Sequence, residues 1–574
     1  MKPASIRWLT GAEAVAISLL AAPSSLVIAI YLLDRLGLAF TPTRMLAVAA
    51  VAPIGALVWL RPQAAWRASE AAGLIAVLAA VLGGLLWIAR PSFLPLGSGP
   101  DLTHHLQLIG FIETHWTLVH DASVEWSIGE MVHYTPGSQA LAALAGAWSG
   151  TDGLHAVHPL LAATVALKAG FLFLITLRLL APDDAERSSQ ASGASQARRI
   201  ALALASVVLL GLPIEYVLGS FVNDSFFAQV VSELFAVGMW WALTAWDDSP
   251  QWRPMAIFAL AGSAAFLTWP VWIGAPFAAL AAVVVWRADV PAKQRIEQIL
   301  IASAPVVVVA GLYLVGRVGW ITIIRTGGKI LQPSLGQYGV SFLALSAAGV
   351  VAAFFERRAR PTLAMTGGIL LEMAALFAVA RTRGPETPYM ALKMFYLLVY
   401  PQAALGALAL AGVFKFVEQR MMHTHASARP HSAAWIPSLV IAMLAVAVVS
   451  GARGTVATLR ATPAISEPLV LAGAWARAHV PPDCVEYLVA DSQTAYWLHL
   501  SALGNPRMSA RTGDSATFRQ RDAIVRWLTP GSLAYAVADL PTLPADVRGD
   551  LDIVASFGSA AVAKRHGPSS CPGT

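Results

Sequence analysis

The residues best suited to chemistry lie in a polar stretch that follows the third apolar run of the sequence. Asp101 opens this stretch, and His104 and His105 follow it in a segment whose pattern predicts a helix. Positions three and four apart share one face of a helix, so we expect these three side chains to lie together. A carboxylate beside two imidazoles can bind a metal, tune a proton transfer, or hold a phosphate when the histidines are charged.

The same stretch stays polar as far as Tyr134. It holds two Asp, three Glu and five His between Asp101 and Tyr134, and Glu130, His133 and Tyr134 stand before the turn Thr135-Pro136-Gly137. Long loops between membrane spans are often functional, so this clustering favours a catalytic or substrate-binding role.

Ordinary structural roles are the alternative for these residues. Asp is favoured at helix N-termini whatever the function, so Asp101 can be a helix cap. His104 and His105 can be interface histidines without a chemical role.

Two later loops carry further candidates for substrate binding. Asn223 and Asp224 lie in one loop, and Arg381, Arg383 and Lys393 lie in or beside the other. Arginine and lysine can receive a phosphate or diphosphate through charge-assisted hydrogen bonds. Anchoring at the membrane interface is the alternative for the three basic residues.

Three ionisable residues lie within apolar runs of the sequence, namely Lys168, Glu233 and Glu372. An ionisable group inside a membrane is costly unless it is paired or lines a wet cavity, so each is a candidate functional residue. A structural ion pair inside a helix bundle is the alternative.

The composition predicts which elements must position these residues. Of 574 residues, 57% are hydrophobic and 13% are charged, and the mean hydropathy is +0.63. Soluble domains carry about a quarter charged residues. Outside closed barrels, a spanning segment must be a helix, because only a helix satisfies its own backbone hydrogen bonds. We therefore expect an all-α polytopic membrane protein with a transmembrane domain at 1–453.

Thirteen spans are expected, and one boundary among them decides the topology. Pro270 interrupts the backbone hydrogen bonds of the run from Met255 to Trp286, so we place two spans there rather than one. Within the loop at 91–153, Ser138 to Trp148 predicts a short amphipathic or interfacial helix. The expected spans are 12–33, 44–60, 70–90, 154–180, 200–219, 227–246, 254–269, 271–286, 298–320, 339–355, 362–380, 393–415 and 435–453.

The distribution of Lys and Arg predicts a cytoplasmic N-terminus. Five basic loops, near Arg61, Arg198, Arg287, Arg357 and Arg420, then fall on the cytoplasmic side, as the positive-inside rule requires. These loops account for the formal charge of +6, so we expect the lipid bilayer and no nucleic acid as a partner. The loop at 91–153 and the C-terminal tail lie outside, which predicts a multi-pass protein of the inner (plasma) membrane.

The tail at 454–574 predicts a small soluble α/β domain outside the cytoplasm. Cys484 to Asp491 alternates in part like a half-buried strand, and Ala472 to His479 is helix-like. Leu533 to Val537 and Ile553 to Ala555 can add further strands.

Both cysteines of the chain, Cys484 and Cys571, lie in this tail. In an oxidising compartment they can form one disulfide. Two unpaired thiols are the alternative, because the sequence does not establish that the two Cα atoms are close.

The arrangement resembles the membrane glycosyltransferases of the GT-C fold. An acidic residue, Asp101, opens the first long external loop, and the turn Tyr134-Thr135-Pro136-Gly137 is similar to the Tyr-Pro-x-Gly turn of many bacterial members. A small soluble domain after the last span is the third shared feature. The sequence departs from the family where some relatives carry paired acids, since Leu102 follows Asp101, and where the loop usually follows the first span, since three expected spans precede it here.

The resemblance implies transfer of a hexosyl or pentosyl group from a polyprenyl-phosphate-linked sugar, on the non-cytoplasmic face, to a glycan, lipid or protein acceptor of the cell envelope. It implies that Asp101 activates or orients the acceptor, assisted by His104 or His105, and that one of the three basic residues named above stabilises the leaving lipid phosphate. It implies no certain cofactor and leaves room for a divalent metal.

Other functions remain open from the sequence. O-antigen ligases and polymerases also act on lipid-linked glycans, but they usually place their large external loop late among the spans. A transporter or flippase would use midplane charges such as Lys168 and Glu372, and it predicts inverted repeats, which the sequence does not display. A non-catalytic member of an envelope-assembly complex would use the tail to bind a partner. Nucleotide-driven pumping and structural zinc lack their usual motifs.

Overall fold

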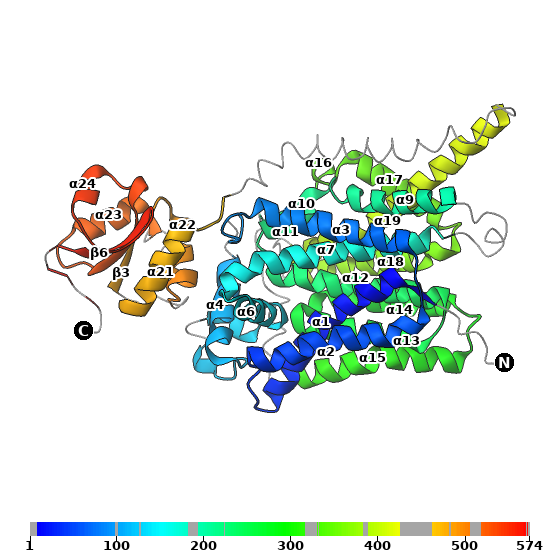
Figure 1. Ribbon diagram of the computed structural model, residues 1–574, viewed down its shortest axis with the longest axis horizontal. Coiled ribbons are helices and arrows are strands. Elements are labelled where there is room, and N and C mark those ends of the chain that lie inside the picture. The colour runs from blue at the N-terminus through cyan, green and yellow to red at the C-terminus, as the bar shows by residue number, and fades with distance from the viewer. Residues whose placement is uncertain are drawn as a thin grey trace.

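The computed structural model is a bundle of helices with a small sheet-containing unit at one end (Figure 1). It describes residues 8–97, 101–124, 128–181, 193–222, 224–315, 330, 332–382, 388–424, 462–481, 484–505, 518–566, 568–569 and 571. Eight helices of these residues have the length and hydropathy needed to cross a membrane. The protein is therefore a polytopic α-helical membrane protein. These helices are α1 (Gly11–Arg35), α2 (Pro42–Leu60), α3 (Ala68–Ile88), α7 (Gly153–Leu179), α12 (Phe227–Asp248), α15 (Ala292–Leu314), α18 (Arg360–Arg381) and α19 (Tyr389–Thr424).

Four shorter helices also lie at expected span positions. The fifth expected span, 200–219, lies closer to the N-terminus than predicted. Its helix, α9 (Gly193–Leu209), ends before Gly211 and Pro213. The last expected span, 435–453, lies outside the described residues. The four shorter helices are α9 (Gly193–Leu209), α13 (Trp252–Thr268), α14 (Gly274–Trp286) and α17 (Val340–Ala353).

The bundle has two ends, which we name the α4 end and the opposite end. The α4 end carries α4 (Asp101–His115) and α6 (Gly137–Ser149) and lies beside the sheet-containing unit (Figure 1). At the opposite end, Arg178 near the end of α7 pairs with Glu13 near the start of α1 and with Asp248 at the end of α12. Helix α1 therefore runs antiparallel to α7 and α12.

The predicted break at Trp269-Pro270 is confirmed. Helix α13 ends at Thr268, the 3-10 helix η4 (Pro270–Ile273) follows, and α14 begins at Gly274. Directly after α14, a nitrogen of Arg287 lies 3.5 Å from a carboxylate oxygen of Asp247 near the end of α12. Helix α14 therefore returns to the opposite end, and the chain crosses the bundle twice between α12 and α15.

Exposed tryptophans occur at both ends of the bundle. Trp87 and Trp148 are exposed at the α4 end, and Trp59, Trp252 and Trp286 are exposed at the opposite end. Tryptophan favours the boundary between membrane and water. The two groups therefore indicate that each end of the bundle lies near a membrane surface.

The helix expected at Ser138 to Trp148 forms as α6, but it is buried rather than interfacial. Its residues from Gly137 to Leu144 are all buried, and Trp148 near its end is exposed. Small residues permit this packing, since a Cβ added to Gly146 would lie 2.5 Å from the carbonyl carbon of Asp152. The run of small side chains therefore lets α6 enter the bundle.

The described C-terminal residues form a mixed sheet packed with helices, in agreement with the α/β domain predicted from the sequence of the tail. The strand order is β3-β4-β6-β5, with β3 parallel to β4 and the other two pairs antiparallel. In this register Tyr487 lies beside Val537, which lies beside Val562. The elements are α21 (Glu467–His479), β3 (Val485–Leu488), α22 (Ser492–Trp497), the π-helix η9 (Leu498–Ala502), α23 (Gln520–Leu528), β4 (Tyr535–Asp539), α24 (Ala545–Gly549), β5 (Leu551–Phe557) and β6 (Ala560–Arg565).

Strand β3 is buried on both faces, so the expectation of a half-buried strand is wrong. All four residues from Val485 to Leu488 are buried. The polar residue among them, Glu486, pairs with Arg526 of α23 at 2.9 Å. An alternating pattern marked this side chain as exposed, but the ion pair allows it to lie beneath a helix.

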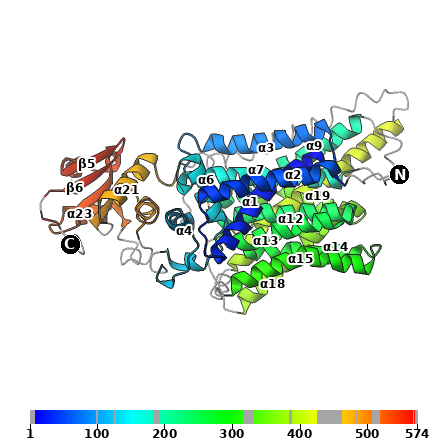
Figure 2. The same cartoon turned by 60° about the horizontal axis from the view of Figure 1, so that its bottom comes forward.

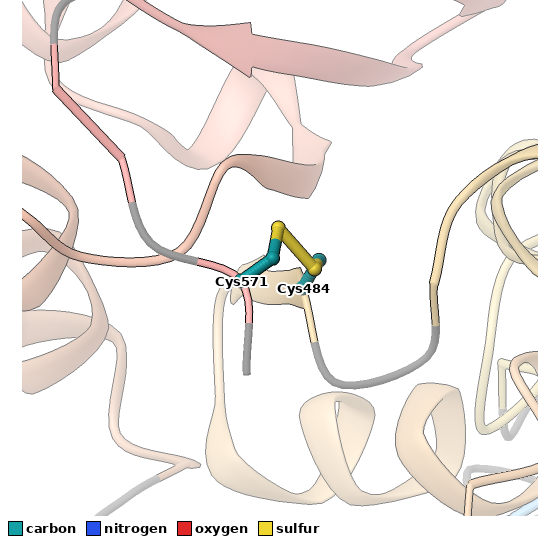
Figure 3. Close-up of a disulfide and its surroundings, with 2 residues drawn as sticks. All are labelled: Cys484 and Cys571. Atoms are coloured by element: carbon teal, nitrogen blue, oxygen red, sulfur yellow. A yellow bond between two sulfur atoms is a disulfide. The ribbon is translucent and has the colours of Figure 1, made fainter. Parts of the chain in front are cut away.

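Of the two alternatives for the cysteines, the structure has the disulfide. Cys484, just before β3, is bonded to Cys571, with the two Cα atoms 5.0 Å apart (Figure 3). The bond joins positions separated by 87 residues, so it fastens the end of the chain to the sheet.

The sheet-containing unit lies next to α4 (Figure 2). Polar side chains connect it to the α4 end of the bundle. His104 Nε2 of α4 lies 2.9 Å from the Tyr496 hydroxyl of α22. His155 Nε2 of α7 lies 3.1 Å from a carboxylate oxygen of Glu467 in α21. Two helices of the bundle thus hold two helices of the C-terminal unit.

Candidate functional site

Asp101, Asp224 and Lys393 come together at the α4 end. Asp101 begins α4, Asp224 lies in the loop before α12, and Lys393 lies near the start of α19. Each of the three interacts electrostatically with the other two. Three residues that the sequence assigns to catalysis and substrate binding therefore form one cluster, which we call the α4-end site.

Lys393 is held in a cage of aromatic rings. Its Nζ lies 4.0 Å from the ring centroid of Phe226, 4.4 Å from that of Tyr389 and 4.9 Å from that of Trp269, and the residue is 4% exposed. A cation within about 6 Å of a ring face is attracted by the ring quadrupole. Among the described residues these rings hold the ammonium without a direct ion pair, so its charge stays available to a ligand.

Asp224 has a carboxyl group that titrates near neutral pH. Burial raises its pKa from 3.8 to about 6, and the charges of Asp101 and Glu215 raise it as well, while the Tyr396 hydrogen bond and Lys393 oppose the shift. The Tyr396 hydroxyl donates to Oδ2 of Asp224 at 2.7 Å. A carboxyl with this pKa can act as an acid or a base near physiological pH.

Asp101 is the half-buried carboxylate of the site. It occupies the first turn of α4, where the helix dipole favours a negative charge. Tyr389 of α19 is one of the three aromatic residues around Lys393, and its hydroxyl lies within hydrogen-bonding reach of Asp101. Asp101 therefore faces the start of α19, where it can meet a substrate held by Lys393.

His105 is neutral at physiological pH. Burial, and then the charges of His104 and Lys393, lower its pKa from 6.5 to about 3. The Gln139 amide nitrogen lies 2.6 Å from His105 Nδ1, so Nδ1 accepts and the ring proton belongs on Nε2. A neutral ring at this position favours structural support over holding a phosphate by charge, and the role of His105 in catalysis stays a prediction.

His104 contacts the C-terminal unit rather than Lys393. Asp101 and His105 both interact with Lys393, as the expected shared face requires. His104 instead contacts Tyr496 of the C-terminal unit. Adjacent residues of a helix point about 100° apart, so the two histidines lie on either side of Asp101, and here His104 is directed toward the C-terminal unit.

The turn after Tyr134 packs against the break between α13 and η4. A Cβ added to Gly137 would lie 2.5 Å from the Thr268 hydroxyl oxygen, so the turn needs glycine at this close approach. The Tyr134 ring centroid lies 5.1 Å from that of His105 and 5.5 Å from that of Trp269. Since Trp269 belongs to the cage, the turn supports one wall of the α4-end site.

The sequence named three basic candidates, and the structure places one of them in the site. Arg381 ends α18, is exposed, and holds its guanidinium 5.1 Å from the Phe377 ring centroid. Arg383 lies outside the described residues. Lys393 is the described basic candidate that interacts with both carboxylates.

For the other three predicted binding residues, no contact with the α4-end site is found among the residues that the structure describes. His133 ends the 3-10 helix η3 (Gly129–His133), one residue before Tyr134, and is half-buried. Glu130 lies within η3. Asn223 lies outside the described residues. Their proposed part in substrate binding stays a prediction.

The sequence reasoning missed the aromatic residues of the site. Tyr389, Lys393, Tyr396 and Tyr400 are spaced at four, three and four residues on α19, which places them on one face of the helix. This polar stripe within an apolar run was a signal for a site facing the bundle interior. Nothing local in the sequence marked Phe226 as a partner of Lys393.

The ionisable residues within the helices of the bundle have structural partners. Lys168 of α7 forms a direct ion pair with Glu233 of α12, and the Tyr400 hydroxyl donates to Glu233 at 3.3 Å. Glu372 of α18 accepts from the backbone N–H of Ala275 at 2.6 Å, in the first turn of α14. The ion pair matches the structural alternative for Lys168 and Glu233, whereas Glu372 is held by a backbone hydrogen bond.

In the part of the chain that the structure describes, no group of three or more His, Cys, Asp and Glu residues is arranged to hold a metal ion. The α4-end site itself contains two carboxylates, Asp101 and Asp224. Lys393 interacts with both of these carboxylates.

No protein-family model and no curated protein matches the chain. Among solved structures, the fold is similar to two crystal structures of an oligosaccharyltransferase from Archaeoglobus fulgidus, one in the apo form and one tethered to an acceptor peptide by a disulfide bond. Both are 14% identical over 81% of this chain and 69% of that one, with TM-scores of 0.49 and 0.43. Because both TM-scores are below 0.5, we base no functional assignment on this similarity.

Proposed function

We propose that the chain is a membrane glycosyltransferase that takes a sugar from a polyprenyl-phosphate donor and transfers it to a cell-envelope acceptor at the α4 end. The observation that supports this most is Lys393. Its ammonium is caged by three rings without a direct ion pair among the described residues, and it stands beside two carboxylates. A lysine ammonium beside two carboxylates can stabilise an anionic leaving group while a carboxylate accepts the proton of the acceptor.

Lys393 receives the phosphate of the donor in this proposal. The aromatic rings stabilise the ammonium but take none of its hydrogen bonds, so a phosphate oxygen can accept them. Lys393 belongs to a helix long and apolar enough to cross the membrane and lies near the end of that helix. In this proposal the side chains that cover Lys393, which is 4% exposed, move aside to admit the headgroup of the lipid, while the polyprenyl chain stays in the bilayer.

In this proposal the two carboxylates orient the acceptor hydroxyl and accept its proton. An acceptor hydroxyl oxygen attacks the anomeric carbon, the bond from that carbon to the phosphate oxygen breaks, and polyprenyl phosphate leaves. Asp101 orients the hydroxyl and takes its proton, and Asp224, with a pKa of about 6, is a second group able to accept it. His105 and Tyr134 support the wall of the site rather than carry charge.

In this proposal the opposite end faces the cytoplasm. That end gathers basic residues in ion pairs, with Arg67 and Arg199 beside Glu70, and Arg357 beside Asp289. Cytoplasmic loops carry an excess of Lys and Arg. The α4-end site and the disulfide then lie outside the cytoplasm, where disulfides persist.

A transfer assay tests the proposal. Membrane vesicles from cells that lack the chain are supplied with wild-type or variant protein and with a panel of labelled polyprenyl-phosphate hexoses and pentoses. We expect the wild type to move label from at least one donor to an acceptor, and Asp101→Asn to slow this by about 10²- to 10⁴-fold. The control is Asp121→Asn, at an exposed position of the same loop. Normal transfer by Asp101→Asn, or no transfer from any donor by the wild type, would contradict the proposal.

A further inference from the structure

The α4-end site has two carboxylates, and a pair of carboxylates is the usual beginning of a divalent cation site. Mg²⁺ and Mn²⁺ prefer carboxylate, carbonyl and water oxygens. Asp101 and Asp224 lie close enough for each to disfavour the charge of the other. The question is whether this donor set suits a metal ion.

Both carboxylates already lie near a fixed positive charge, the ammonium of Lys393. Lys393 interacts electrostatically with Asp101 and with Asp224. Its ammonium is enclosed by Phe226, Trp269 and Tyr389, which restrict its movement away from them. A divalent cation bound to the two carboxylates would have to lie next to this ammonium, and like charges repel.

Each of the three side chains that could bind a metal here already has a hydrogen-bond partner. The Tyr396 hydroxyl donates to Oδ2 of Asp224 at 2.7 Å, and the Tyr389 hydroxyl lies within reach of Asp101. His105 offers Nδ1 to the Gln139 amide at 2.6 Å. These contacts match carboxylates held by hydrogen-bond donors, rather than a set of free ligands directed at one point.

We propose that Lys393 takes the place of a divalent cation, so that the α4-end site binds a lipid phosphate through a lysine ammonium and excludes Mg²⁺ and Mn²⁺. The lipid-phosphate part rests on the proposed function. The exclusion of metal rests only on the arrangement of Lys393, Asp101 and Asp224. The two parts can therefore fail separately.

The first arm of the test uses Mn²⁺ alone and needs no lipid. Purified full-length protein in detergent is titrated with Mn²⁺, and bound metal is measured by electron paramagnetic resonance. We expect no binding that depends on Asp101 or Asp224 in the wild type. Lys393→Met keeps the volume and the apolar contacts of the cage while removing the charge, so it should create a Mn²⁺ site that a further Asp224→Asn substitution abolishes.

Controls keep this arm interpretable. Lys293→Met, at an exposed position of α15 at the opposite end, should leave Mn²⁺ binding unchanged. Unchanged thermal unfolding shows that Lys393→Met is folded, and Lys393→Ala serves if it is not. Wild-type Mn²⁺ binding that is lost on Asp224→Asn would overturn the proposal, as would a folded Lys393 variant that gains no Mn²⁺ site.

The second arm uses polyprenyl phosphate. We expect wild-type binding of this lipid to be the same in EDTA and in excess Mg²⁺, and to fall at least tenfold in Lys393→Met. A loss of binding in EDTA overturns the lysine-for-metal proposal. If the wild type binds no polyprenyl phosphate under either condition, the lipid-phosphate part fails together with the proposed function, while the Mn²⁺ arm still decides the exclusion of metal.

Discussion

The Tyr396 hydroxyl lies 2.7 Å from Oδ2 of Asp224 and joins α19 to the loop before α12. Tyr396 stands one turn after Lys393, which stands one turn after Tyr389. One face of α19 thus supplies a donor to Asp224, a cation, and a hydroxyl within reach of Asp101. The geometry of the α4-end site depends on this helix.

Transfer should depend on pH through Asp224. Burial, and then the charges of Asp101 and Glu215, raise its pKa to about 6, so the carboxyl is protonated below pH 6 and cannot accept a proton there. We expect the transfer rate to rise as pH increases through about 6, and Asp224→Asn to remove that rise. Tyr396→Phe removes a hydrogen bond that favours the charged form, so it should move the inflection to higher pH. A profile that Asp224→Asn leaves unchanged excludes this role.

Lys393, and not Arg381, should govern the affinity for the donor. A hydrogen bond to a charged group contributes about 1.5–3 kcal/mol, so Lys393→Met should weaken binding of polyprenyl phosphate by about ten- to a hundredfold. Arg381→Ala changes an exposed residue that lies against Phe377 and should have little effect. Direct binding measurements in nanodiscs compare the two variants, and the reverse order of effects would assign the phosphate to α18 instead.

The Lys168–Glu233 pair should stabilise the bundle without taking part in transfer. Removing one partner leaves the other charged and buried, which costs about 3–5 kcal/mol. We expect Glu233→Ala to lower the midpoint of thermal unfolding strongly and Lys168→Met/Glu233→Met to recover much of the loss. If the double variant is as unstable as the single one, the pair is not a self-contained structural unit.

The disulfide should stabilise the C-terminal unit. It closes a long segment of the chain, and loss of such a bond typically costs about 2–5 kcal/mol. Pulse proteolysis in urea should show that Cys571→Ser lowers the midpoint of this unit in the full-length protein, and reduced wild type should behave like the variant. Mass spectrometry after alkylation should find both thiols blocked before reduction. Rapid alkylation of the unreduced wild type would contradict the bond.

The large elements of the fold were predictable because each is marked locally. A helix beginning at Asp101 follows from its polar start, and the break at Trp269-Pro270 follows from the proline. Strand β6 was missed because Ala560, Ala561, Val562 and Ala563 are all buried and give no alternation.

The site was predictable only in part because its geometry is not local. The sequence named Asp101, Asp224 and Lys393 but treated Arg381 and Arg383 as equivalent to Lys393. What distinguishes Lys393 is a cage built from three separate segments, and no pattern of residues along the chain brings Phe226, Trp269 and Tyr389 together. The direction of His104 likewise depends on Tyr496, which is remote in sequence.

A double-mutant cycle of Asp101 and Lys393 in the transfer assay tests the central claim most directly. Residues that act together in one step are strongly non-additive when removed together. We expect Asp101→Asn and Lys393→Met each to slow transfer at saturating donor by at least about a hundredfold, and the double variant to be little slower than the slower single variant. Independent, multiplying losses, or normal transfer by either single variant, would contradict a single glycosyl-transfer site at the α4 end.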